Sequence, residues 1–170
     1  MEIKLLLGIA SAVISVISFF PYLRDIFRGK TRPHAYSWLI WAILQAVGAA
    51  AQLKSGGGYG AWVLIVGAVL CAGIFILSFK YGTGNITKFD QVCLFASLAT
   101  LGCYLFFQNP FWAVLLVTAT DLFGFLPTFR KAYVEPSTET SSTFILSAVA
   151  NLLSLFAIQK YSLTTTLSIS

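Results

Sequence analysis

The 170-residue chain has a composition that excludes most soluble proteins. Apolar residues make up 58% of it and charged residues 10%, against roughly 45–50% and roughly 25% in an ordinary globular domain. A soluble domain of about 150 residues still leaves some 30% of its surface in water, which is too much for a chain this apolar. The net charge of +5 comes without a long basic run. We therefore predict an integral membrane protein and exclude disordered, disulfide-stapled and nucleic-acid-binding proteins.

Six apolar stretches are long enough to cross a bilayer, which takes about 20 residues. Short polar, charged or glycine-rich breaks separate them, so no separate soluble domain fits. We predict an all-α, multi-pass membrane protein, and we expect the residues after 160 to be too few for another crossing. The predicted spans are residues 5–22, 36–53, 60–80, 89–107, 111–129 and 143–159.

The basic residues are unevenly divided between alternate loops. Eight of the 11 Lys and Arg residues follow spans 1, 3 and 5, and three lie on the other side. Since loops rich in Lys and Arg face the cytoplasm, we predict that these three loops are cytoplasmic and that the N-terminus is outside. We expect the plasma membrane of a prokaryote as the location. The single histidine, His34, lies in the first of these loops and is expected to be solvated.

An internal repeat with an offset of 106 residues relates two parts of the chain. Matched loop residues and a matched proline are more than two unrelated apolar helices would share. The copies are separated by an even number of crossings, so we predict a parallel repeat with its axis along the membrane normal. The identical pairs are Phe19 and Phe125, Pro21 and Pro127, Arg24 and Arg130, Ala42 and Ala148, Ala51 and Ala157, and Lys54 and Lys160.

The repeat divides the chain into three predicted parts. Residues 1–80 form a first three-helix unit, residues 81–109 a linker helix, and residues 110–170 an incomplete second unit. By the same offset, the third helix of the second unit would begin near residue 166. The sequence leaves open whether a seventh helix was removed, was never present or is supplied by a second chain.

Two similar segments carry a resemblance to a known family. Pro21-Tyr22 is followed by RDIFRGKTRPHAYSW, and Pro127-Thr128 by RKAYVEPSTETSSTF. A proline near the cytoplasmic helix end, a short basic loop, and then two hydroxyl residues resemble the SWEET and PQ-loop transporter superfamily. The resemblance covers about residues 10–80 and 115–165. It implies two three-helix bundles joined by a linker helix, although Tyr22 and Thr128 stand where that family carries glutamine.

Asp121 is the most informative polar residue within a predicted span. It lies about ten residues into span 5, where a carboxylate costs about 2.5–3.5 kcal/mol and so faces the bundle interior or a wet cavity. We predict that it binds solute and carries a coupled proton. The alternative is a structural aspartate that ties helices together through Thr118, Thr120 or Asn151.

Other polar residues complete the predicted site. Gln45 and Asn151 occupy equivalent positions in the repeat and either line one central pocket or pair packed helices. Pro21 and Pro127 each remove a backbone donor from a helix and are the predicted hinge or gate. Most of the tryptophans lie near span ends and are expected to be interfacial anchors. The predicted substrate-binding set is Ser15, Trp41, Gln45, Asp121, Ser147 and Asn151.

The leading functional prediction is a transporter that moves a small polar solute, sugar-like or amino-acid-like, by alternating access. The alternative is a ligand or cargo receptor on the same scaffold, similar to the KDEL receptor. A membrane enzyme is not expected, because the chain has no HExxH motif, no Ser-His-Asp set and no carboxylate pair within its spans. The expected partners are a solute and the lipid bilayer, with no nucleic acid, metal or cofactor. Homo-oligomers are left open.

Overall fold

The computed structural model describes residues 2–54, 60–106 and 110–157, and in this part of the chain it is all-helical. The all-α prediction is therefore confirmed for the described residues, whereas the residues after 160, which are expected to be too few for another crossing, lie outside them. The elements are α1 (Glu2–Phe27), α2 (Ala35–Lys54), α3 (Gly60–Tyr81), α4 (Lys88–Phe106), α5 (Pro110–Val134), the short 3₁₀ helix η1 (Pro136–Thr138) and α6 (Ser141–Ala157).

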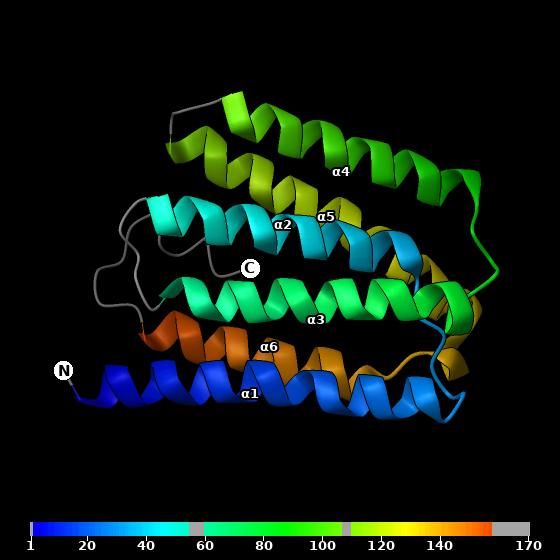
Figure 1. The fold of residues 1–170 in the computed structure, drawn as a ribbon, viewed down its shortest axis with the longest axis horizontal. Coiled ribbons are helices and arrows are strands. Elements are labelled where there is room, and N and C mark those ends of the chain that lie inside the picture. Colours follow the sequence, from blue (N-terminus) through cyan, green and yellow to red (C-terminus); the bar gives the residue numbers. More distant parts are fainter. Residues whose placement is uncertain (1, 55–59, 107–109, 158–170) are drawn as a thin grey trace.

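The helices lie side by side along one long axis (Figure 1). Helix α1 packs on α6, α2 packs on both α3 and α5, and α4 packs on α5. The three described connections, residues 28–34, 82–87 and 135–140, all lie at the end of the bundle opposite the N-terminus. We call this end the loop end.

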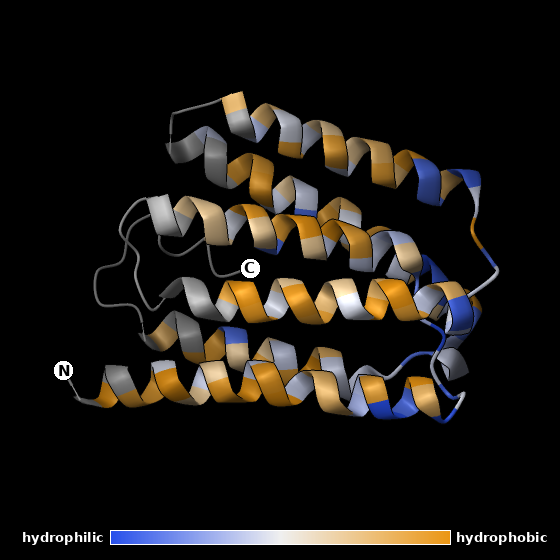
Figure 2. Cartoon of the chain, in the orientation of Figure 1, coloured by the Kyte–Doolittle hydropathy of each residue, from blue (hydrophilic) through white to orange (hydrophobic). Residues whose placement is uncertain are grey.

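The polarity of the bundle is the reverse of a soluble protein. Apolar side chains cover the outer faces of the helices, and charged residues gather at the loop end (Figure 2). For example, Phe79 and Phe106 are 76% and 87% exposed, whereas Asp90 and Lys131 are fully buried. In a soluble domain, Lys and Asp are almost never fully buried and large apolar patches are rare. The distribution suits a bundle surrounded by lipid.

Two helices meet the length and hydropathy of a membrane span among the described residues. They are Leu6–Phe27 and Leu64–Tyr81, and only 17% and 22% of their span windows are buried inside the bundle. The core helix of a soluble protein would be mostly buried. Two of the six predicted spans are thus supported by both length and hydropathy, while α4 and α5 also carry charged residues.

The helix bounds follow the predicted offset. Helix α2 begins at Ala35 and α6 at Ser141, which are 106 positions apart, and α1 and α5 end at Phe27 and Val134, which are 107 apart. Exchanging the two copies also turns the α1–α6 contact into the α2–α5 contact.

Side-chain geometry repeats in the same way. The rings of Phe19 and Trp38 lie 6.1 Å apart at 56°, and those of Phe125 and Phe144, each 106 positions later, lie 6.4 Å apart at 60°. The aromatic contact between α1 and α2 is therefore matched by the one between α5 and α6.

The helices do not end at the two prolines, near which the predicted spans ended. Helix α1 continues for six residues past Pro21, and α5 continues for seven past Pro127. The extra turns are held by packing at the loop end, where Ile26 and Lys131 are fully buried. Packing thus compensates for the backbone donor that each proline lacks, and the predicted bounds 5–22 and 111–129 were too short.

Candidate functional site

Trp41 and Asp121 form the centre of the candidate site, where α2 meets α5. The indole Nε1 of Trp41 is buried and makes no hydrogen bond of normal geometry, yet it lies close enough to interact with the Asp121 carboxylate. Gly124, one turn after Asp121, allows this approach, because a Cβ atom there would lie 3.3 Å from Trp41 Nε1 and 3.0 Å from Ile40. The site therefore combines an unpaired donor with a half-buried carboxylate.

The structural partners considered for Asp121 do not hydrogen-bond to it among the described residues. There the Thr118 hydroxyl has no hydrogen-bond partner, and the Thr120 hydroxyl donates to the Leu116 carbonyl 2.8 Å away and bonds with Thr100 of α4. Asn151 is exposed on α6. None of these three side chains holds the Asp121 carboxylate.

A second pair of polar residues joins α1 to α6. The Ser147 hydroxyl donates to Ser18 Oγ at 3.1 Å, and Ser18 donates to the Ser15 carbonyl at 2.7 Å. Ser18 and Ser147 correspond, 106 positions apart, to Gly124 and Trp41. The two inter-copy contacts are thus equivalent, one made by two hydroxyls and the other by an indole against a glycine.

Gln45 does not line a central pocket. Its Nε2 donates to Cys71 Sγ of α3 at 3.2 Å, and its side chain lies against Gly67 of the same helix. Because α3 offers both a partner and space, the amide pairs two packed helices, which was the alternative considered for it. The contact favours this alternative over the pocket role predicted for Gln45.

Asn151, the equivalent of Gln45, is also not part of the site. Among the described residues, α6 packs chiefly on α1, and the face that carries Asn151 is exposed. Of the six predicted site residues, the structure places Trp41, Asp121 and Ser147 at junctions between the copies. Ser15 contributes its carbonyl through Ser18 and is itself half-buried.

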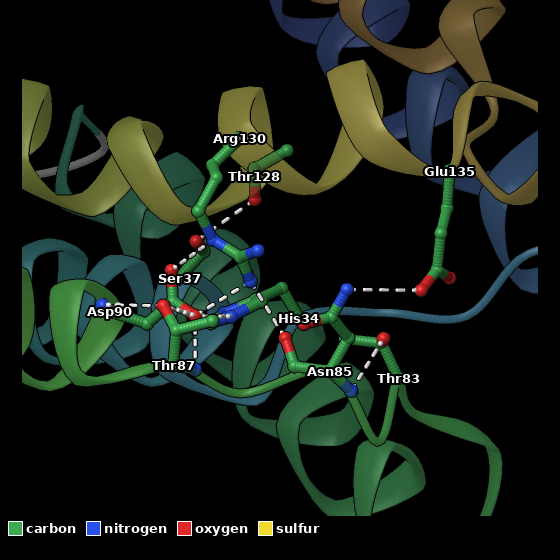
Figure 3. A network of polar contacts seen from close by, with 9 residues as sticks. All are labelled: His34, Ser37, Thr83, Asn85, Thr87, Asp90, Thr128, Arg130 and Glu135. Atoms are coloured by element: carbon green, nitrogen blue, oxygen red, sulfur yellow. Dashed lines mark hydrogen bonds and ion pairs between the residues drawn. The ribbon is translucent and has the colours of Figure 1, made fainter.

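A polar network ties α4 to α5 at the loop end (Figure 3). The Asp90 carboxylate accepts hydrogen bonds from Arg130 Nε at 2.8 Å and Nη2 at 2.7 Å, and from the Thr87 N–H at 2.7 Å. Arg130 also donates to the Asn85 carbonyl at 2.6 Å. Two-point guanidinium–carboxylate pairing is among the stronger polar contacts in proteins. We call Asp90, Arg130, Thr87, Asn85 and His34 the Asp90 network.

His34 is a fully buried member of this network, so the expectation of a solvated histidine was wrong. Its Nε2 lies 3.5 Å from Asp90 Oδ2. Burial lowers the pKa of His34 although the neighbouring Asp90 raises it. The ring is enclosed because the α3–α4 connection closes over it, where the Thr83 N–H donates to the Pro33 carbonyl at 3.1 Å.

We expect His34→Asn to reduce the loss of stability on acidification. An unfolded histidine has a pKa of about 6.5, so below that pH the unfolded chain binds a proton that folded His34 resists, and the folded state loses up to about 1.4 kcal/mol per pH unit. Between pH 7.5 and pH 5.5, the melting temperature of the wild type should fall further than that of the variant. Asp90, Arg130 and Lys131, the charged groups around His34, are common to both proteins. Equal falls would contradict the prediction.

A second buried cluster joins α5 to the connection that precedes α6. Lys131 Nζ donates to Glu139 Oε1 at 2.8 Å and to the Thr138 carbonyl at 2.6 Å, and both charged side chains are almost fully buried. Burial raises the pKa of Glu139, and the Lys131 charge opposes that rise. Glu139 also faces Tyr22, whose hydroxyl accepts from Trp38 Nε1 at 3.1 Å. We call Lys131, Glu139, Tyr22 and Trp38 the Lys131 cluster.

The two loop-end groups were not anticipated from the sequence. The sequence pattern assigns no site role to Asp90, Lys131 or Glu139, and it predicts an interfacial anchor at Trp38, whereas Trp38 is only 3% exposed. The signal that could have found one pair is spacing, since Lys131 and Glu139 flank a tight turn that contains Pro136. Within the described ranges, no group of three metal-ligating side chains occurs.

Comparison with known proteins gives no family. No family model, no curated protein and no solved structure matches this chain. The resemblance to the SWEET and PQ-loop superfamily therefore remains an expectation, and function has to be argued from the geometry.

Proposed function

We propose that the protein is a multi-pass membrane carrier that moves a small polar solute by alternating access. The apolar outer surface, the polar interior and the two span-length helices support the membrane assignment. The matched bounds and ring geometry of α1–α2 and α5–α6 support two equivalent units that rock against each other.

The observation that carries the proposal is the Asp121–Trp41 pair at the junction of the two units. A carboxylate inside an apolar bundle costs about 2.5–3.5 kcal/mol. The ion pairs formed by the described residues lie at the loop end, so none of them compensates Asp121. A polar or cationic group of a solute, or a proton, would pair with Asp121. The unpaired indole N–H supplies a donor for the same solute.

Contacts across the loop end support a closed gate, which an alternating-access cycle needs in one of its states. The Asp90 network holds α4 and α5 together beside the start of α2, and the Lys131 cluster joins α5, the last connection and α1. Between them, the Thr128 hydroxyl of α5 donates to Ser37 of α2 at 2.9 Å (Figure 3). In our proposal these contacts form the gate, with the turns after Pro21 and Pro127 as its moving parts.

The charge distribution orients the proposed carrier. Of the 11 basic residues, eight flank the three connections of the loop end, and the N-terminus lies at the opposite end. By the positive-inside rule, this charge distribution favours a cytoplasmic loop end and an external N-terminus, and we propose the plasma membrane of a prokaryote as the location. The receptor alternative has less support, because a peptide terminus needs unpaired pocket charges and the buried charges at the loop end pair with one another.

Asp121→Asn tests the proposal directly. Purified protein in liposomes should take up at least one solute from a panel of sugars and amino acids in a saturable way. The variant keeps its size but loses the charge, and we expect uptake to fall about tenfold or more. Asn151→Ala, on the exposed face of α6, is the matched control and should transport normally.

The outcomes separate the parts of the proposal. No saturable uptake by the wild type of any solute in the panel would reject the carrier assignment. Unchanged uptake by Asp121→Asn would reject the site. If uptake falls but its dependence on pH stays the same as in the wild type, Asp121 binds solute without coupling transport to protons.

A further inference from the structure

A hollow of about 250 Å³ opens at the loop end, between the α1–α2 connection and the end of α3. It is distinct from the Asp121 site, which lies between α2 and α5. Two cations line it, Arg32 from the connection and Lys80 from α3, together with Thr31 and Tyr81. Since Arg32 and Lys80 come from different elements and are both exposed, they present two positive charges to one space.

The described residues that line the hollow are cationic or uncharged. No acidic residue lines it, and the neighbouring carboxylate on α1 belongs to Asp25. That carboxylate is already engaged, because it accepts from Arg24 Nε at 2.9 Å and from the Thr140 hydroxyl at 3.1 Å. The hollow therefore has a net positive charge available to a ligand.

The backbone gives the hollow its shape. Gly29 has a φ of +68°, which non-glycine residues rarely adopt. No neighbouring atom among the described residues lies within 4 Å of the position that a Cβ atom would take there. Gly82 lets the end of α3 approach the connection closely, since a Cβ atom there would lie 3.0 Å from the Pro33 carbonyl oxygen. The two glycines thus set both walls of the hollow.

The rim of the hollow continues into apolar surface. The Phe27 ring lies 6.0 Å from that of Tyr81, which lines the hollow, and Phe27 is 63% exposed. Phe79, one residue before Lys80, is exposed to a greater extent. These residues belong to α1 and α3, the two helices that meet the requirements of a membrane span. A cationic hollow above an apolar track matches a phospholipid, with a charged headgroup and long chains.

We propose that this hollow binds the phosphate group of an anionic phospholipid. Arg32 has the planar donor fork that recognises phosphate oxygens, and Lys80 adds a point charge. The proposal goes beyond solute transport and rests on the membrane assignment made above. Basic residues near the membrane surface attract anionic lipid headgroups by about 1 kcal/mol per Lys or Arg.

Lipid retention by the full-length protein tests the site. Detergent-purified protein is titrated with phosphatidylglycerol or phosphatidylcholine, and bound lipid is counted by native mass spectrometry. We expect preferential retention of phosphatidylglycerol and a loss of about tenfold or more in its affinity for the R32Q/K80Q variant. The control R28Q/K88Q removes the same charge from exposed positions at the same end that do not line the hollow, and it should retain the lipid.

Three results would overturn the proposal. The first is equal retention of both lipids, and the second is an equal loss of lipid in the control variant. The third is that glycerol 3-phosphate stabilises the wild type without displacing any bound lipid, which would assign the site to a free phosphate ester. If R32Q/K80Q does not fold, the single K80Q variant, which changes only an exposed side chain, is measured instead. Retention is measured without transport, so the lipid site is judged separately from the carrier function.

Discussion

Replacing Arg130 with methionine is expected to lower the free energy of unfolding by about 3 kcal/mol. The substitution keeps most of the side-chain volume but leaves the fully buried Asp90 carboxylate without its two-point partner. Removing one partner of a buried ion pair typically costs about 3–5 kcal/mol. We place the loss at the low end because Thr87 still donates two hydrogen bonds to Asp90. Unfolding by SDS in mixed micelles measures the difference.

The repeat provides a matched control for this variant. Arg24 is the equivalent of Arg130, but it is largely exposed and pairs with its neighbour Asp25 at the surface. Exposed ion pairs contribute little, so Arg24→Met should leave stability almost unchanged. If the two variants lose similar stability, the Asp90 network does not hold the loop end together.

Replacing Lys131 with methionine is expected to cost about 3–5 kcal/mol at neutral pH, because Glu139 would remain buried and charged without its partner. Burial already raises the pKa of Glu139, and loss of Lys131 raises it further. A raised carboxyl pKa favours the folded state below the unfolded pKa and disfavours it as the pH rises. The loss in free energy of unfolding caused by Lys131→Met should therefore be smaller at pH 5 than at pH 7.

The double variant K131M/E139Q separates charge from packing. It removes both charges, so it should recover much of the stability that Lys131→Met loses. Lys88→Met, at an exposed position on α4, controls for the change in net charge. A double variant no more stable than the single one at every pH would show that shape, rather than the unpaired carboxylate, causes the loss.

The helices were predictable because each depends on its own sequence. Apolar length identified all six described helices, and the 106-residue offset predicted where α6 begins relative to α2. The errors concern positions where distant segments decide the outcome. Gln45 is polar and lies mid-span, which fits a pocket equally well, and only the packing of α3 gives it Cys71 as a partner.

The loop-end groups illustrate the same limit. A histidine in a basic connection is expected to be solvated, and nothing local shows that the α3–α4 connection covers His34. Asp90 and Arg130 are 40 residues apart, so their pairing follows from the way α4 packs on α5. By contrast, Asp121 was found from the sequence alone, because a carboxylate within a long apolar run is unusual whatever surrounds it.

Among the described residues, the linker helix α4 has its two-point ion pair with only one of the two similar units. Asp90 in its first turn holds Arg130 of α5, while the equivalent Arg24 of α1 pairs with its own neighbour Asp25. The first unit meets Asp90 through His34, whose Nε2 lies 3.5 Å from the carboxylate. In any rocking motion we therefore expect α4 to travel with the second unit.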